Sequence, residues 1–386
     1  MTQYRYPCTG NISLHGFGEF LEKEIGEPRR NIQLFTKELN DFHGSEFITL
    51  TNSGSSANLV AAMALAEKVK SEGKPLTAFA SAFTFPTTLS ALILAGFKVR
   101  LIDTEPNGFN IDINRLRRYK KGASVIAITH FLGFPCKTFD FLEYARSCGG
   151  YLLQDACETM ELRETSGGTP QWAYGDITTF SFYHPHHLSS YGGGAVLCTE
   201  LDDHILCDSI AHWGRACKCH FDPSLCHAPE GSAHQFTYER LGVNVEMSEL
   251  NAAFGRWQLR NWNEIERRRK ENYAILLDTL KDNKSLQVWE IPWWRCSNSP
   301  FVFPIRLRNG LTVNDAFNIL SKEGVEIRTL MGGAAITHPA FKGKITHDDQ
   351  KNALAMSLDT FFVGVHHTLP AEDVKSVAEI INKKFS

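Results

Sequence analysis

Three histidines within four positions form the segment best suited to acid–base chemistry. His184, His186 and His187 lie in the run SFYHPHH, directly after a β-rich stretch. An imidazole has an ordinary pKa of about 6.5, so a neutral histidine accepts a proton readily at physiological pH. Histidines this close together also serve as metal ligands. The triplet therefore predicts a general base, a metal site or a solvated loop.

A second reactive segment is rich in cysteine. Cys217, Cys219 and Cys226 have the spacing C-x-C-x6-C within WGRACKCHFDPSLC, a stretch without helix or strand periodicity. Clustered thiolates bind zinc or iron–sulfur clusters, and three such ligands need a fourth. His220 or His227 would complete a zinc site. Reduced thiols in a surface loop and a disulfide are the alternatives, and a reducing compartment disfavours the disulfide.

Three further features are consistent with one bound ligand. Gly54 and Ser55 stand between a strand-like run and a helix, where backbone N–H groups and the helix N-terminus attract phosphate. Asp155 closes a strand-like run, and a carboxylate at the carboxyl end of a parallel strand faces the ligand crevice. Its alternative role is a helix N-cap. Phe85, in AFTFPTT, offers a ring for stacking on a flat group, or else belongs to the core.

The elements that must position these residues alternate along the chain. From Glu46 onward, short β-rich runs such as VRLID and YLLQDAC are separated by helical runs such as SANLVAAMALAEKVK. This alternation predicts βαβ units and a mostly parallel sheet, an α/β fold. After Met247 a long helical stretch leads to a small α+β unit. We expect an N-terminal segment over 1–30, a large domain over 31–265 and a small domain over 266–386.

Composition excludes several classes of partner. The formal net charge of the 386 residues is −3, which gives no electrostatic grip on nucleic acid or on an anionic membrane. The N-terminus lacks the pattern of a signal peptide, and no apolar stretch approaches the roughly 20 residues that span a bilayer. The sequence therefore predicts a cytoplasmic protein.

The motifs also occur in an informative order: GSSAN, FTFPTT, VIAITHFLGFP, QDACE, FSFYHPHH, GGGAV and LGVNVEMSELNAAFGRWQL. This ordered set resembles the DegT/DnrJ/EryC1 family of sugar aminotransferases. The resemblance implies a pyridoxal phosphate-dependent dimer of fold type I, with a mostly parallel seven-stranded sheet flanked by helices. In it Asp155 would pair with the pyridine nitrogen, Phe85 would stack on the ring and Glu158 would touch the phenolic oxygen. The implied phosphate ligands are Gly54, Ser55, Ser181 and, from the neighbouring subunit, Asn244.

The lysine that holds the cofactor in this family is missing. His186 occupies its place in the motif, and no lysine occurs between Lys137 and Lys218. The cofactor would then bind without a covalent bond, as pyridoxamine phosphate, and ordinary transamination is excluded. His186 is the predicted base, and His187 is expected to orient it.

A histidine at this place resembles the sugar 3-dehydrases of the family, above all the iron–sulfur enzymes of the ascarylose type. That resemblance implies a 2Fe–2S cluster held by Cys157, Cys217, Cys219 and Cys226. It also implies a nucleotide-linked 4-keto-6-deoxyhexose as substrate and an NAD(P)H-dependent flavin/iron–sulfur reductase as electron donor. The remaining cysteines show no ligand spacing and are predicted to pack in the interior: Cys8, Cys136, Cys148, Cys198, Cys207 and Cys296.

Three other functions stay open. A cluster-free dehydratase of the colitose type would regenerate its pyridoxamine from glutamate and leave the cysteines incidental. A related reductive dehydration could also act on a non-nucleotide substrate. A silent sensor or scaffold would bind the cofactor without turnover.

Overall fold

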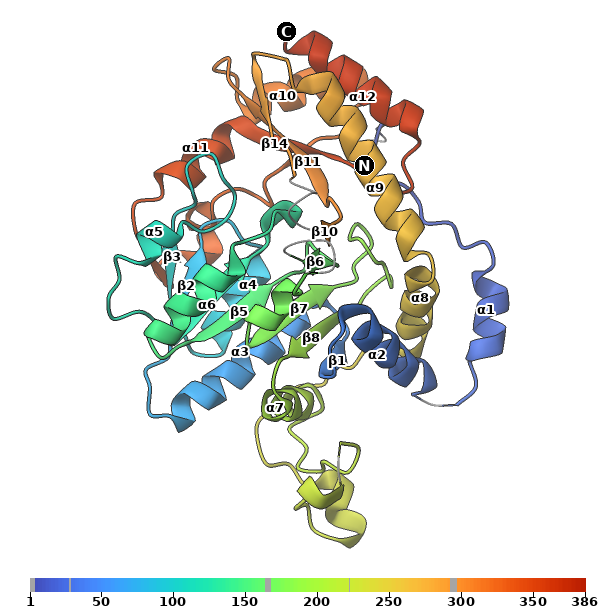
Figure 1. Ribbon diagram of the computed structural model, residues 1–386, viewed down its shortest axis with the longest axis vertical. Helices are drawn as coiled ribbons and strands as arrows, with labels where there is room; N and C mark the ends of the chain where they lie inside the picture. Colours follow the sequence, from blue (N-terminus) through green and yellow to red (C-terminus); the bar gives the residue numbers. More distant parts are fainter. Residues whose placement is uncertain (1–3, 28, 164–167, 222, 292–296) are drawn as a thin grey trace.

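The largest element is an eight-stranded sheet with the order β1-β8-β7-β5-β4-β2-β3-β13, in which only β8 runs against its neighbours (Figure 1). The computed structural model describes residues 4–27, 29–163, 168–221, 223–291 and 297–386. The strands of this sheet are β1 (Ile48–Thr51), β2 (Thr77–Ser81), β3 (Lys98–Ile102), β4 (Val125–Thr129), β5 (Tyr151–Asp155), β7 (Ile177–Ser181), β8 (Gly194–Cys198) and β13 (Ile345–His347).

The predicted α/β class with a mostly parallel sheet is confirmed, but the predicted count of seven strands is wrong for the described residues. The eighth strand, β13, comes from the C-terminal part of the chain and pairs in parallel with β3, Ile345 opposite Val99. A segment of only three residues carries too little periodicity to be recognised in a sequence.

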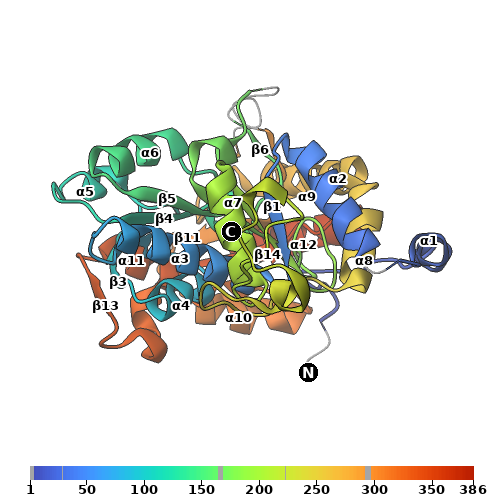
Figure 2. The same ribbon diagram turned by 90° about the horizontal axis from the view of Figure 1, so that it is seen from below.

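Helices cover both faces of the sheet because the strands are apolar on both sides. Along β4, Val125 and Ala127 pack toward α3 (Gly54–Ser71) and α4 (Pro86–Leu94), whereas Ile126 and Ile128 pack toward α6 (Thr138–Ser147). Successive strand residues point to opposite faces, so both sets are buried. Figure 2 shows α6 on one side of the sheet and α3 and α4 on the other. The other helices of this part are α1 (Phe17–Glu24), α2 (Arg30–His43), α5 (Ile113–Leu116) and α7 (Leu201–Ala211).

The C-terminal part has its own sheet, with the order β12-β14-β11-β9, and its own apolar core. The predicted long helical stretch is two helices, α8 (Glu249–Leu259) and α9 (Trp262–Leu280), and the boundary expected at residue 265 falls inside α9. The other elements are β9 (Leu286–Val288), β11 (Val302–Leu307), α10 (Val313–Leu320), β12 (Arg328–Thr329), α11 (Lys351–Asp359), β14 (Thr360–Gly364) and α12 (Ala371–Lys384). A two-stranded pair joins β6 (Leu162–Arg163) to β10 (Ser297–Asn298).

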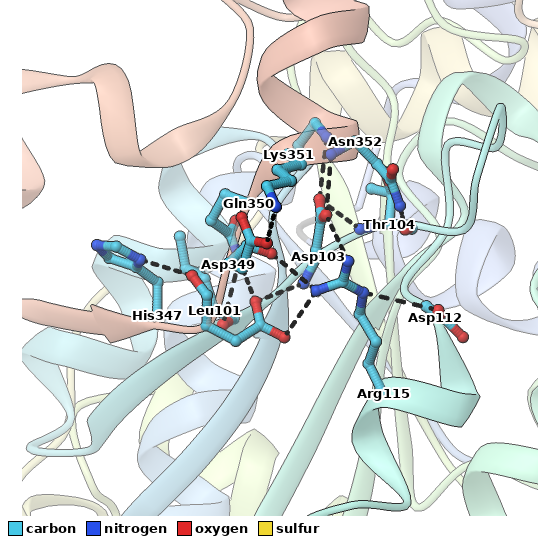
Figure 3. Close-up of polar contacts among 12 residues, drawn as sticks. Leu101, Asp103, Thr104, Asp112, Arg115, His347, Asp349, Gln350, Lys351 and Asn352 are labelled. Carbon is cyan, nitrogen blue, oxygen red and sulfur yellow. Dashed lines mark hydrogen bonds and ion pairs between the residues drawn. The ribbon is translucent and has the colours of Figure 1, made fainter.

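One buried carboxylate fastens the C-terminal part to the large sheet (Figure 3). Asp103 follows β3 and is fully buried. Its two oxygens accept hydrogen bonds from the backbone N–H groups of Asn352 and Ala353, both at 2.9 Å, and so cap the first turn of α11. Arg115 lies 3.4 Å from the same carboxylate, and Asp348 accepts the Asp103 backbone N–H at 3.1 Å. The two parts therefore meet through polar contacts with defined partners.

An arm projects from the end of the molecule opposite the C-terminal sheet, below α7 in Figure 1. We define the arm as residues 217–236. At its base the two ends of the arm pair as a short antiparallel ribbon. The Ala216 backbone N–H donates to Thr237 O at 2.9 Å, and Arg215 forms an antiparallel β-bridge with Tyr238. None of the described side chains in the arm is buried.

Within the described residues, no helix has both the length and the apolar character needed to cross a bilayer.

Candidate active site

A cavity of about 690 Å³ opens where the carboxyl ends of the parallel strands face the C-terminal part. This is the edge at which open α/β sheets bind ligands, and the volume suits a cofactor together with a substrate. Seven predicted residues line it: Gly54, Ser55, Phe85, Asp155, Glu158, Ser181 and His186. Cys157 also lines it.

Asp155 ends β5 with a carboxylate held by three donors. Its Oδ2 accepts hydrogen bonds from Asn58 Nδ2 at 3.0 Å and from Thr88 Oγ1 at 2.5 Å. Its Oδ1 accepts one from the Cys157 backbone N–H at 3.1 Å. Donors on several sides fix the direction of the carboxylate. Asp155 is therefore prepared to pair with a protonated ring nitrogen, and it does not cap a helix.

A tight concave surface lies at the N-terminus of α3. A Cβ added to Gly54 would lie 2.6 Å from Ser181 Cβ and 2.9 Å from Cys157 Sγ, so only glycine leaves this space open. Ser53 caps the helix by accepting from Ser56 N at 3.1 Å, and Ser55 Oγ lies 3.0 Å from Thr87 Oγ1. Free N–H groups at a helix N-terminus bind phosphate, so this surface fits the phosphate of the implied cofactor.

Phe85 and Glu158 complete the surroundings of a flat ring. Phe85 precedes α4 and leaves 46% of its surface exposed while lining the cavity, so it is not part of the core. Glu158 is buried, and burial raises the pKa of its carboxyl to about 8, against the hydrogen bond from the Leu132 backbone N–H. At neutral pH Glu158 is therefore mainly protonated and can donate a hydrogen bond.

The ring of His186 has a defined protonation state. Its Nδ1 lies 2.5 Å from the carbonyl oxygen of Cys157, which can only accept, so Nδ1 carries the hydrogen and Nε2 is left with a free lone pair. Burial, helped by the nearby Arg269 and opposed by the Cys157 carbonyl, lowers the pKa of His186 to about 4. The ring also stacks on Phe301, with centroids 5.1 Å apart. His186 thus presents a neutral base to the cavity.

The loop that carries His186 is fixed by Arg269, which is fully buried in α9. Its Nη2 donates to His186 O at 2.8 Å and to Pro185 O at 3.1 Å, and its Nη1 donates to Phe301 O at 3.1 Å. Sequence reasoning missed this residue, because the run ERRRKE reads as the solvated face of a helix.

The expectation that His187 orients His186 is wrong. The His187 side chain is buried outside the cavity, and its Nε2 lies 2.8 Å from Ser299 O. His184 stacks on Tyr191 and His366 instead, at 5.5 and 6.0 Å. The side chains of the triplet diverge, and the described residues show no metal group there.

Two further residues differ from the predicted set of cofactor contacts. Asn244 is exposed and does not line the cavity of its own chain, so its reach into a neighbouring subunit stays a prediction. Arg328 on β12 was not predicted. It is the only cationic side chain other than histidine among the described lining residues, which include no lysine.

The cysteine-rich segment folds into the arm, and there the predicted ligand set is wrong in one member. Cys217, Cys219 and Cys226 converge, but the fourth donor within 4.8 Å is His234. Cys157 lies instead in the cavity against Gly54, because sequence proximity to Asp155 places it at the strand end. His220, another candidate, bonds to Asp208 at 3.0 Å. Among the described residues, the four-cysteine set predicted to hold a 2Fe–2S cluster is therefore not assembled.

The remaining cysteines are mostly interior, as predicted. Cys8, Cys136, Cys198 and Cys207 are buried, whereas Cys148 is only half-buried. Cys296 lies outside the described residues.

The fold is that of the pyridoxal phosphate-dependent enzymes of fold type I. A crystal structure of the E. coli GDP-4-keto-6-deoxy-D-mannose-3-dehydratase with bound hydrated PLP superposes with a TM-score of 0.86, at 21% identity, over 98% of this chain and 100% of that one. Residues 15–382 match the DegT/DnrJ/EryC1/StrS aminotransferase family, and the chain belongs to that family.

Two relatives cover most of the chain. The lipopolysaccharide biosynthesis protein RfbH of Salmonella typhimurium is 29% identical over 91% of this chain and 84% of its own length. The dTDP-4-dehydro-2,6-dideoxy-D-glucose 3-dehydratase of Saccharopolyspora spinosa is 28% identical over 92% and 80%, respectively.

Proposed function

We propose that this protein is a pyridoxamine phosphate-dependent dehydratase that removes the C3 hydroxyl of a nucleotide-linked 4-keto-6-deoxyhexose. The observation that carries the proposal is the free Nε2 of His186 in a cavity whose described lining contains no lysine. The same lining includes the surface at Gly54 that fits a phosphate, which we call the phosphate cradle. The names of the relatives, which include dehydratases acting on GDP- and dTDP-linked sugars, support the substrate class.

The residues present fit the cofactor. Asp155 would hold the ring nitrogen protonated, Phe85 would cover one ring face, and Gly54, Ser55 and Ser181 would hold the phosphate. When bound, the cofactor supplies an amine that reacts with the 4-keto group and a ring that accepts electrons. Without a lysine the cofactor has no covalent tether, which excludes the ordinary route of an aminotransferase.

His186 performs the proton transfers. Its Nε2 removes a proton from the carbon that bears the cofactor's amine, and it then holds a proton that the departing 3-hydroxyl needs to leave as water. The ring keeps its direction because Nδ1 is bonded to Cys157 O and Arg269 fixes the backbone of the loop. A neutral imidazole at pH 7 is ready for the first step.

Glu158 and Arg328 serve binding. Protonated Glu158 would donate a hydrogen bond to the phenolic oxygen of the cofactor, which a carboxylate would repel. Arg328, already 2.9 Å from Glu326, would meet the diphosphate of the nucleotide. We also propose a homodimer in which Asn244 of one subunit completes the phosphate site of the other.

The test is turnover of purified protein supplied with pyridoxamine phosphate and glutamate on GDP-, dTDP- and CDP-4-keto-6-deoxyhexoses, with loss of the C3 oxygen from the sugar followed by mass spectrometry. We expect dehydration of at least one of them and a loss of about 10²–10⁴-fold in His186→Asn, the usual contribution of a general base. His187→Asn is the matched control and should retain most of the rate. Amino transfer to the sugar, or full activity in His186→Asn, would refute the proposal.

A second candidate is the reductive 3-deoxygenation predicted from the sequence, which adds a 2Fe–2S cluster and the flavin/iron–sulfur reductase. The convergence of Cys217, Cys219 and Cys226 favours it, and the position of Cys157 in the cavity weighs against it. The candidates differ in one observable. The reductive enzyme would turn over only when an external electron donor is supplied, whereas the cluster-free dehydratase would take its two electrons from the pyridoxamine, which glutamate regenerates.

A further inference from the structure

We infer that the arm holds a single tetrahedral metal ion, Zn²⁺ by ligand chemistry, through Cys217, Cys219, Cys226 and His234. The inference concerns a site outside the cavity, so it does not depend on the proposed dehydration.

The four donor atoms surround one point. His234 Nε2 lies 3.1 Å from Cys217 Sγ, 3.3 Å from Cys219 Sγ and 3.6 Å from Cys226 Sγ. With metal–sulfur and metal–nitrogen bonds of about 2.3 and 2.0 Å, a tetrahedral ion places its nitrogen and sulfur ligands about 3.5 Å apart. The observed nitrogen–sulfur distances lie within a few tenths of an ångström of this value, as expected for donors that converge on one ion.

The same distances do not suit a two-iron cluster. All four donors lie within 4.8 Å of one another. In a 2Fe–2S cluster two bridging sulfides separate the irons, so ligands on different irons stand farther apart than ligands that share one metal. The set also contains three thiolates and one imidazole, a combination that is common for structural zinc.

The tautomer of His234 is the one a metal requires. Its Nδ1 lies 3.0 Å from the carbonyl oxygen of Pro229, so Nδ1 carries the hydrogen and the lone pair of Nε2 points to the three sulfurs. A hydrogen bond from the second ring nitrogen to a carbonyl is the usual support of a metal-bound histidine. Cys226 has support of its own, since the Lys218 backbone N–H donates to its Sγ at 3.4 Å.

The arm also needs a cross-link. None of its described side chains is buried, and its helical content is limited to two short 3₁₀ turns, Pro223–Leu225 and Gly231–Phe236. A segment of this size without an apolar core gains its fold from bound metal. With four protein ligands no coordination position stays open, so the ion is structural rather than catalytic.

The experiment measures metal and labile sulfide in the full-length protein, and then titrates metal-free protein with Co²⁺. We expect one zinc per chain without sulfide, and one equivalent of Co²⁺ with the intense visible bands of a tetrahedral thiolate site. His234→Ala should abolish these bands and His234→Cys should restore them at shifted positions. His220→Ala, in the same arm but bonded to Asp208, should leave them unchanged.

Other results would overturn the inference. Two irons and two sulfides per chain, lost in Cys157→Ser, would establish the four-cysteine cluster. Failure of the wild-type protein to bind either Zn²⁺ or Co²⁺, or unchanged Co²⁺ bands in His234→Ala, would remove the site. Circular dichroism of each variant verifies that the body of the protein remains folded, so that loss of metal is not loss of fold.

Discussion

The cavity and the arm bring reactive side chains together by different means. In the cavity, each functional group stands at the end of a strand or helix and is fixed by buried partners, as Asp155 is by Asn58 and Thr88. In the arm, Cys217 and His234 belong to chain without helix–sheet packing around it, and no buried side chain supports either of them among the described residues. The cavity is thus organised before any ligand arrives, whereas the arm depends on its ligand for its shape. This difference predicts which perturbations each region withstands.

Among the predictions, loss of Asp155 should have the largest effect, and that effect is on cofactor binding in the cavity. Asp155→Ala should weaken pyridoxamine phosphate binding by roughly 3–5 kcal/mol, about a hundredfold or more in Kd, because a protonated ring nitrogen would be buried without its carboxylate. Absorbance titration measures this. The matched control is Asp176→Asn, a buried carboxylate paired with Arg146 away from the cavity, which should bind the cofactor normally. Equal binding by Asp155→Ala would show that the phosphate cradle alone carries affinity.

The junction in Figure 3 tests whether the cavity depends on its distant supports. Asp103→Ala leaves the part-buried N–H of Asn352 and the buried N–H of Ala353 without an acceptor and should lower the free energy of unfolding by roughly 2–4 kcal/mol. Denaturant unfolding provides the measurement, and Asp349→Ala, at an exposed neighbouring carboxylate, is the control. A loss below that of the control would mean that the junction contributes no stability.

The pH profile of kcat/KM tests the protonation states of His186 and Glu158, the two cavity groups whose pKa values are shifted. His186 must be neutral and Glu158 protonated, so the rate should fall below about pH 4 and above about pH 8. Glu158→Gln keeps a hydrogen-bond donor but cannot ionise, and should remove the alkaline limb. Glu105→Gln, at a half-buried carboxyl outside the cavity whose pKa burial also raises, should keep it. An alkaline limb that persists in Glu158→Gln would assign it to another group.

The free energy of unfolding should also depend on pH through His186 and Glu158, and the two contributions change in opposite directions as pH rises. The pKa of His186 is lowered on folding, so its contribution to stability is lost as pH falls from the unfolded value of 6.5 toward about 4. The pKa of Glu158 is raised on folding, so its contribution is lost as pH rises from 4.5 toward about 8. The combined loss from the two groups is therefore smallest between about pH 4.5 and 6.5.

The sequence predicted the cavity far better than the arm, and the two modes of construction explain why. Gly54 and Asp155 sit at element boundaries, where residue type and strand direction together determine what faces the ligand. Cys157 was assigned to the metal because it neighbours Asp155, yet sequence proximity only guaranteed a place in the cavity. His234 was missed because it lies 15 residues beyond Cys219, in a segment whose course no periodicity reveals. His187 was misplaced because successive side chains of a turn point in different directions.

The smallest effect we expect is that of metal removal on the stability of the body of the protein, which is the chain outside the arm. This effect distinguishes the arm from the cavity most clearly. Removal of metal by a chelator should change the free energy of unfolding of the body by no more than about 0.5 kcal/mol, because no described side chain of the arm is part of an apolar core. The arm itself should open by local unfolding, and trypsin should then cut after Lys218, whose backbone N–H is otherwise bonded to Cys226. Limited proteolysis followed by mass spectrometry measures this, with resupplied Zn²⁺ as the control. A chelator that instead unfolds the body cooperatively would show that arm and cavity form one unit, and the contrast between a preorganised site and a ligand-shaped one would fail.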